Sequence, residues 1–319
     1  MIKLFKVFSK ILYKILGISR IPFYRYPITR RGFKRFYKLV ATLTGRDISD
    51  PKVRFSSGPE KILEKLEETG FFVANPQDYS IQFQEALKKA MSAASRLIDD
   101  DVSKLVGGKK YLLNLDLAKA PKTEVQTMYN FFCRPEIESL ASAYLGEKAL
   151  MVELKVLLSP IIELPYYDGS QLWHSDFDDV SNLKLFVFLE DVTEDSGPLE
   201  VLNKSLTGHL MKSWGYLWGK RGVSHNDAIV PLEHKHKSIS LVGRAGSIAF
   251  VDTVQCLHRG SRNPKRTRKI LYATFNSRSS FRFPPHHWIL GKRFAGSWVS
   301  PLLTLDPDKK FLTDLAINS

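Results

Sequence analysis

Two metal-binding residue types stand two positions apart near the middle of the chain, in the run Gln171-Leu-Trp-His174-Ser-Asp176-Phe. In a β-strand, residues i and i+2 project from the same face, so the His174 imidazole and the Asp176 carboxylate are expected to point the same way. The pair then offers one nitrogen and one oxygen to a single ion. Because a His-x-Asp sequence also arises by chance, a metal centre here requires a third ligand.

His258 is the candidate for that ligand, in the run Asp252-Thr-Val-Gln-Cys-Leu-His258-Arg-Gly-Ser-Arg-Asn263. Two histidines and one carboxylate form the facial triad that holds Fe(II) and leaves coordination positions open. Oxygen chemistry requires open positions, because O₂ and a cosubstrate must both reach the iron. Arg268 follows at the head of a predicted strand over residues 269–275. A guanidinium in that place suits bidentate pairing with a carboxylate of a small diacid.

The runs around these residues, in their order and spacing, resemble the phytanoyl-CoA dioxygenase family of non-haem Fe(II)- and 2-oxoglutarate-dependent oxygenases. The similarity covers roughly residues 60–276. The matching segments are Leu63–Phe72, Gln171–Asp176, Leu185–Val192, Asp195–Val201, Gly246–Phe250, and His258 with Gly260, Ser261, Asn263 and Arg268.

The resemblance implies a role for each matching residue. His174, Asp176 and His258 become the iron ligands, and no catalytic residue is implied beyond them. Arg268 becomes the partner of the distal carboxylate of 2-oxoglutarate, with Arg266 as its rival because Arg268 lies one residue closer to the distal histidine than the family pattern suggests.

Ser261 and Lys155 are further candidates for contact with 2-oxoglutarate. One departure from the family is the turn Leu202–Leu206, which replaces the usual Pro-Gly-Ser-His near the substrate entrance. Related halogenases carry a small residue in place of the carboxylate ligand, so the presence of Asp176 argues against halogenation.

The expected activity is hydroxylation of a C–H bond in a small-molecule or lipid-like substrate. The expected cofactors are Fe(II), 2-oxoglutarate as cosubstrate and O₂, with ascorbate as a possible reductant, and the by-products are succinate and CO₂. Desaturation, epimerisation or cyclisation by the same iron chemistry is an alternative. A second alternative is a non-catalytic, cupin-like binding protein, for which a lost ligand would be the sign.

Other histidines and aromatic residues have weaker patterns. Glu233–His236 offers two imidazoles but no third ligand, which favours a solvated loop, and the default for His286-His287 is a structural turn. The insertion 203–237, with Trp214, Tyr216, Trp218, Lys220 and Arg221, is interpreted either as a lid or substrate wall or as plain packing. The tail 277–303 specifies no ligand.

Hydrophobic periodicity predicts the elements that position these residues. It indicates helices from Pro59 to Gly70, over 80–105 and over 134–145, with a short strand at 71–74. From about residue 150 the chain changes to short β-rich runs: 149–158, 183–189, 199–202, 238–242, 247–251 and 269–275. The predicted fold class is mainly β with peripheral α: a double-stranded β-helix (jelly-roll, cupin-like) core over about 150–276, with N-terminal helices packed outside, within one domain over 47–319.

The net charge of +14 is concentrated in an N-terminal arm, residues 1–46, with twelve Lys or Arg and no acid. The remaining residues carry 35 basic and 33 acidic side chains. Residues 1–16 are predicted to form an amphipathic helix with Lys3, Lys6, Lys10 and Lys14 on one face.

Three interpretations of the arm remain open: a helix lying on an anionic membrane surface, a helix packed on the body, or a mitochondrial transit peptide or nucleic-acid arm. Nucleic acid is not the expected partner, because the body is nearly neutral. The expected location is cytoplasmic, with peripheral attachment to a membrane as one option, and two cysteines fit a reducing compartment. The oligomeric state has no signature in the sequence.

Overall fold

The architecture comes from a computed structural model of the 319-residue chain. It describes residues 27–43, 59–100, 105–117, 119–176, 179–218, 223–262 and 264–277. The helix predicted over residues 1–16, His286-His287 and the tail beyond residue 277 lie outside the described residues. Within the described residues, no helix is long and apolar enough to cross a membrane.

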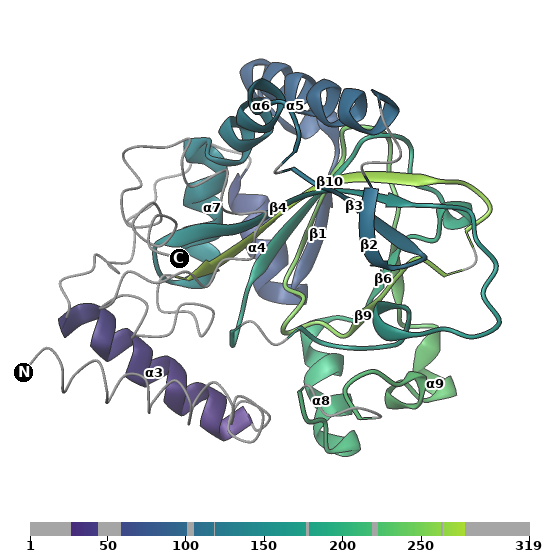
Figure 1. The fold of residues 1–319 in the computed structure, drawn as a ribbon. Coiled ribbons are helices and arrows are strands. Elements are labelled where there is room, and N and C mark those ends of the chain that lie inside the picture. Colours follow the sequence, from purple (N-terminus) through teal and green to yellow (C-terminus); the bar gives the residue numbers. More distant parts are fainter. Residues whose placement is uncertain are drawn as a thin grey trace, which may run out of the picture.

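Two antiparallel β-sheets form the centre of the molecule (Figure 1). The large sheet has the order β1-β8-β5-β10-β4-β3-β2 and the small sheet the order β7-β6-β9. Non-sequential neighbours and an all-antiparallel register are the features of the cupin-like jelly-roll that the sequence predicts, so the fold class is confirmed. The strands are β1 Phe71–Ala74, β2 Leu105–Lys109, β3 Leu112–Leu115, β4 Ala149–Ser159, β5 Leu183–Phe188, β6 Leu199–Val201, β7 Ile239–Leu241, β8 Ile248–Val251, β9 His258–Arg259 and β10 Arg268–Ser277.

The side chains of β10, a central strand of the large sheet, show how the two layers are built. Leu271, Ala273 and Phe275 are buried in a core shared with the helices, whereas Ile270 and Tyr272 join the cluster between the sheets. This alternation is the two-residue period of a strand that is buried on both faces. One face therefore anchors the sheet to the helices, and the other is left to form a site.

The helices lie mainly outside the sheets. They are α3 Pro27–Leu43, α4 Pro59–Thr69, α5 Ile81–Asp100, α6 Lys122–Phe132, α7 Pro135–Leu145, α8 Lys204–Trp214 and α9 Leu232–Lys235. Figure 1 shows α4 to α7 around the large sheet and α8 with α9 beside the small one. The predicted stop signals of α4 and α7 are confirmed, since Gly70 and Gly146 both have positive φ, at 89° and 65°.

The helix predicted over 80–105 is too long at its C-terminal end. It ends at Asp100, and Leu105 already belongs to β2, which pairs with β3. The acidic pair Asp99-Asp100 lies at the helix C-terminus, where the helix dipole disfavours negative charge. Leu105 pairs with Leu115 in a hairpin, a contact that helical periodicity does not reveal.

The insertion 203–237 contains a capped helix, which the sequence interpretation missed. Asn203 Oδ1 accepts from the Leu206 amide at 2.8 Å, and Gly215 ends α8 with φ of 64°. Both cap residues are visible in the sequence as ordinary helix signals. Tyr216 is buried against Trp173 and Leu210, so this part of the insertion packs on the body.

Candidate metal centre

His174 and His258 lie opposite each other on two extended segments. The His174 amide donates to the His258 carbonyl at 3.0 Å, and the reverse bond is 2.9 Å. His258 opens β9, whereas His174 forms only an isolated bridge rather than the continuous strand that was predicted. The residue spacing still places His174 and Asp176 on one side, because the segment is extended over those residues.

The ligand atoms of His174, Asp176 and His258 lie within 4.8 Å of one another, a spacing that allows one metal ion to bind all three. In the described part of the chain, this is the one group of three or more histidine, cysteine or acidic residues so arranged. His234 lies in α9, a short helix where the sequence favoured a loop, and His236 is exposed beyond it. The structure thus brings together the three residues selected from the sequence.

Backbone carbonyls fix the orientation of both imidazoles. His174 Nδ1 lies 2.9 Å from the Leu172 carbonyl, and His258 Nδ1 lies 3.0 Å from the Cys256 carbonyl. A carbonyl only accepts, so Nδ1 carries the proton and Nε2 is left as a lone-pair donor. Burial lowers the pKa of both histidines, which favours the neutral form that binds metals.

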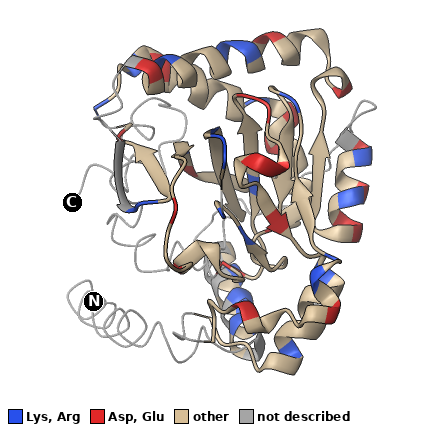
Figure 2. Ribbon diagram, turned by 90° about the vertical axis from the view of Figure 1, so that its right-hand side faces the viewer, with Lys and Arg blue, Asp and Glu red and all other residues tan. Residues whose placement is uncertain are grey.

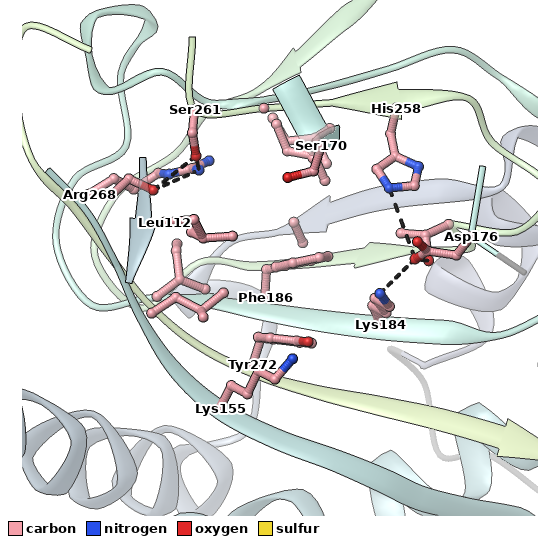
Figure 3. A pocket seen from close by; sticks show the side chains of 18 of the residues that line it. Leu112, Lys155, Ser170, Asp176, Lys184, Phe186, His258, Ser261, Arg268 and Tyr272 are labelled. Carbon is pink, nitrogen blue, oxygen red and sulfur yellow. Dashed lines mark hydrogen bonds and ion pairs between the residues drawn. The ribbon is translucent and has the colours of Figure 1, made fainter. Parts of the chain in front are cut away.

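Asp176 is held through one carboxylate oxygen. Lys184 Nζ and Thr253 Oγ1 each donate to Asp176 Oδ2 at 2.6 Å, and the Asp176 amide donates to the Thr253 carbonyl at 2.9 Å. Burial alone would raise the pKa of this carboxyl, but the charge of Lys184, followed by His258 and His174, holds it well below its usual range. Asp176 is therefore a carboxylate whose Oδ2 is held by Lys184 and Thr253 and lies 4.0 Å from His258 Nε2 (Figure 3).

Three neighbours of the triad were not found from the sequence. Lys184 and Thr253 come from β5 and from the turn after β8, and nothing local to either residue indicates contact with Asp176. His225 stacks on His174, with ring centroids 4.8 Å apart. Since these contacts join residues on separate elements, only the folded structure reveals them.

Arg268 is a buried cation, with 8% of its surface exposed. Its Nη2 donates to Ser261 Oγ at 2.9 Å and to Ser159 Oγ at 3.2 Å, and its Nε has no hydrogen-bond partner among the described residues. Burial lowers the pKa of this guanidinium to about 10, with no carboxylate to offset the loss of hydration. The rival Arg266 is exposed, so Arg268 is the arginine that faces the site.

Ser261 has an unusual backbone, with φ of 56° in a residue other than glycine. Gln171 Nε2 donates to its carbonyl at 2.7 Å, and its own amide donates to the Gly197 carbonyl at 3.1 Å. A side chain in this region costs about 1–3 kcal/mol and is kept where surrounding contacts impose it. Here the strained backbone points the Ser261 hydroxyl at Arg268.

The triad and Arg268 line one cavity of about 320 Å³ between the two sheets. Figure 3 shows Arg268 and Ser261 on one side of it and His258 and Asp176 on the other. Between these two ends, the walls of the cavity are largely apolar. They are formed by Leu112, Leu157, Phe186, Phe188, Ala249 and Ile270. The arrangement offers a metal at one end and a carboxylate-binding guanidinium at the other.

Lys155 also lines the cavity, but away from Arg268. Its ammonium lies 2.7 Å from Glu153 Oε1 and 5.6 Å from the centroid of the Tyr272 ring. The Glu153 carboxylate in turn accepts from the Tyr272 hydroxyl at 2.6 Å. The structure therefore groups Ser261 with Arg268, and places Lys155 in a separate polar cluster on the cavity wall.

Comparison with solved structures gives the same architecture. The chain shares the fold of an iron-containing epimerase. The match is to the epimerase SnoN in complex with Fe³⁺, alpha ketoglutarate and nogalamycin RO, with a TM-score of 0.50 and 16% identity over 70% of this chain and 84% of that one. EctD from S. alaskensis with 2-oxoglutarate and 5-hydroxyectoine matches at TM-score 0.49 and 18% identity, covering 72% of this chain and 81% of that one.

AviO1 from Streptomyces viridochromogenes Tue57 matches with a TM-score of 0.46 and 17% identity, over 70% of this chain and 97% of that one. No protein-family model matches the sequence, and none of the curated proteins is significantly similar to it. Membership of the phytanoyl-CoA dioxygenase family therefore stays a prediction.

Proposed function

We propose that this protein is a non-haem Fe(II)- and 2-oxoglutarate-dependent dioxygenase that hydroxylates a C–H bond of a small-molecule or lipid-like substrate. The observation that carries the proposal is the pairing, in one cavity, of a His-Asp-His triad with a buried arginine that has no acidic partner among the described residues. The jelly-roll fold supports it. The ordered motifs of the sequence resemble those of the phytanoyl-CoA dioxygenase family, which also supports the proposal.

The residues fit these cofactors chemically. Two neutral imidazoles and one carboxylate suit Fe(II), and Arg268 with Ser261 suits the distal carboxylate of a diacid. When bound, iron with 2-oxoglutarate and O₂ supplies a two-electron oxidation, with succinate and CO₂ as by-products.

The protein's own backbone and side-chain groups hold the ligands and orient the cosubstrate. The Leu172 and Cys256 carbonyls keep the two imidazole Nε2 atoms pointed at the metal position, and Lys184 with Thr253 fixes the carboxylate. Arg268 orients the cosubstrate along the cavity. The apolar wall excludes bulk water, which protects the reaction from side pathways.

Desaturation, epimerisation and cyclisation use the same centre and are alternative outcomes of the same chemistry. None of the three ligands is missing, which argues against the non-catalytic alternative. We place the enzyme in the cytoplasm, whose reducing conditions suit a chain with only two cysteines, Cys133 and Cys256.

The test is turnover of 2-oxoglutarate with Fe(II), ascorbate and O₂, followed as succinate by mass spectrometry. Wild-type protein is expected to form succinate, at a slow rate without substrate and faster when a substrate is added. His174→Ala is expected to abolish the signal, and the exposed His236→Ala to leave it unchanged. Equal succinate formation by His174→Ala and wild type would refute the proposal.

A further inference from the structure

The helix α3 has an inner face that is fixed to the catalytic body. Arg30 is buried, donates to the backbone carbonyl of Asp179, and its guanidinium lies 4.4 Å from the centroid of the Trp218 ring. Lys34 Nζ lies 2.9 Å from Asp179 Oδ2 and 3.7 Å from Glu147 Oε1, both buried carboxylates. Because buried ion pairs are lost only at high cost, α3 keeps a defined orientation on the body.

The outer face of α3 carries two adjacent stripes. Arg31 and Arg35 repeat at helical spacing and are exposed, whereas the ammonium of Lys38 lies 3.8 Å from the buried Glu147 Oε1 of the body. Beside them, Phe36 and Leu39 stand three residues apart and are 44% and 56% exposed. Figure 1 shows this helix at the periphery, apart from the two sheets.

The charge of α3 is of one sign. It contains no acidic residue, and neither does the rest of the segment 1–46. On the body, by contrast, basic and acidic residues alternate over the helices (Figure 2). The basic face is therefore a local feature of this helix and not part of a generally cationic surface.

We propose that the outer face of α3, defined as Arg31, Arg35, Phe36 and Leu39, docks on the surface of a bilayer that contains anionic lipids. An interfacial helix lies in the plane of the membrane with its apolar stripe in the acyl boundary and its basic stripe at the headgroups. Phe36 and Leu39 favour a bilayer over nucleic acid, because contact with a phosphate backbone needs cations but no exposed apolar side chain.

Docking in this way would orient the cavity relative to the membrane. Asp179, which anchors Lys34, follows the proposed metal ligand Asp176 by three residues. The helix on the bilayer is thus attached to the segment that carries one side of the centre. The docking itself does not depend on which reaction the centre performs.

The experiment is co-sedimentation of the full-length chain with vesicles of phosphatidylcholine and phosphatidylserine, and with vesicles of phosphatidylcholine alone. Wild type is expected to bind the mixed vesicles selectively, and less so as salt is raised. The double variant R31Q/R35Q is expected to lower the partition coefficient about fivefold for each arginine removed. F36S/L39S is expected to lower it by about tenfold or more.

K88Q/K89Q is the matched control, because these two lysines are exposed on α5 and their loss removes the same charge. It is expected to bind the mixed vesicles like wild type. The proposal is overturned if both α3 variants bind as tightly as wild type, or if neutral vesicles bind equally well. Binding to a DNA duplex without binding to vesicles would also overturn it, in favour of a nucleic-acid partner.

Discussion

At the scale of single residues, the candidate centre is defined by how its ligands are held. Asp176 Oδ2 receives one charged and one neutral hydrogen bond, from Lys184 and Thr253, each 2.6 Å long. The two histidines are oriented by backbone carbonyls. Such supporting contacts keep ligands in place before the metal arrives, so their removal should weaken binding without removing any ligand.

Thr253→Val tests this support with no change of charge. The variant loses the hydroxyl that donates to Asp176 but keeps the shape of the side chain. Metal affinity, measured by calorimetric titration with Mn(II), is expected to fall about 10- to 100-fold. Thr253→Ser restores the donor and should restore affinity, and an unchanged affinity in Thr253→Val would mean that this bond does not position the ligand.

Arg268→Gln tests whether Arg268 binds the distal carboxylate of 2-oxoglutarate. The variant removes the buried guanidinium, so the distal carboxylate of 2-oxoglutarate loses its charged partner. Loss of one partner of a buried charge pair costs about 2–5 kcal/mol, which is at least a 30-fold rise in the dissociation constant. The exposed Arg266→Gln is the control, and an effect as large in that variant would reassign the site.

At the scale of elements, the close approach of the Gly70 backbone to Cys256 constrains how α4 packs against the large sheet. Gly70 ends α4 and precedes β1, with φ of 89°, and a Cβ on it would lie 2.4 Å from Cys256 Sγ. Cys256 is two residues before His258, so this contact supports the segment that carries a ligand. Gly70 is therefore required both as the residue that ends the helix and as the residue that leaves room for the Cys256 sulfur.

Gly70→Ala is therefore expected to destabilise the fold by about 1–3 kcal/mol, through strain and overlap with the buried sulfur. Gly208→Ala, in the exposed part of α8 where a Cβ would meet nothing within 4 Å, is expected to raise stability by up to about 1 kcal/mol. Urea unfolding of the two variants measures both. If Gly70→Ala proves as stable as Gly208→Ala, the backbone approach is not a constraint.

At the scale of the whole molecule, local sequence patterns predicted most of the helices and strands but few of the contacts between them. Strands after residue 150 were predictable because their β-rich runs are short and bounded by turns, and the ligand triad was predictable because its three residue types recur in an ordered pattern. The β2–β3 hairpin and the Lys184 and Thr253 contacts were not predictable. The hairpin strands are short, and the two side-chain contacts depend on how separate elements are placed, as in Asp176 with Thr253, which no local period encodes.

The buried histidines also predict how the stability of the whole protein depends on pH. Burial lowers the folded-state pKa of His174 and His258, so below the unfolded value of about 6.5 the unfolded chain binds more protons. The free energy of unfolding of the metal-free protein is expected to fall as the pH drops below about 6.5, by up to about 1.4 kcal/mol per pH unit for each histidine. Urea unfolding on either side of that pH measures the slope.

His258→Gln should reduce that slope by about a third to a half, since burial lowers the pKa of His225 as well as those of the two ligand histidines. A slope unchanged by the substitution would show that other groups set the acid sensitivity.

We expect the cavity between the two sheets to hold Fe(II) and 2-oxoglutarate together. Anaerobic titration of the Fe(II)-loaded protein with 2-oxoglutarate tests it most directly, because chelation of the metal by the 2-oxo acid gives a visible charge-transfer absorption. Wild type is expected to develop this absorption saturably at one equivalent, and Arg268→Gln to require much more 2-oxoglutarate. Absence of the absorption in wild-type protein that has bound Fe(II) would contradict the claim.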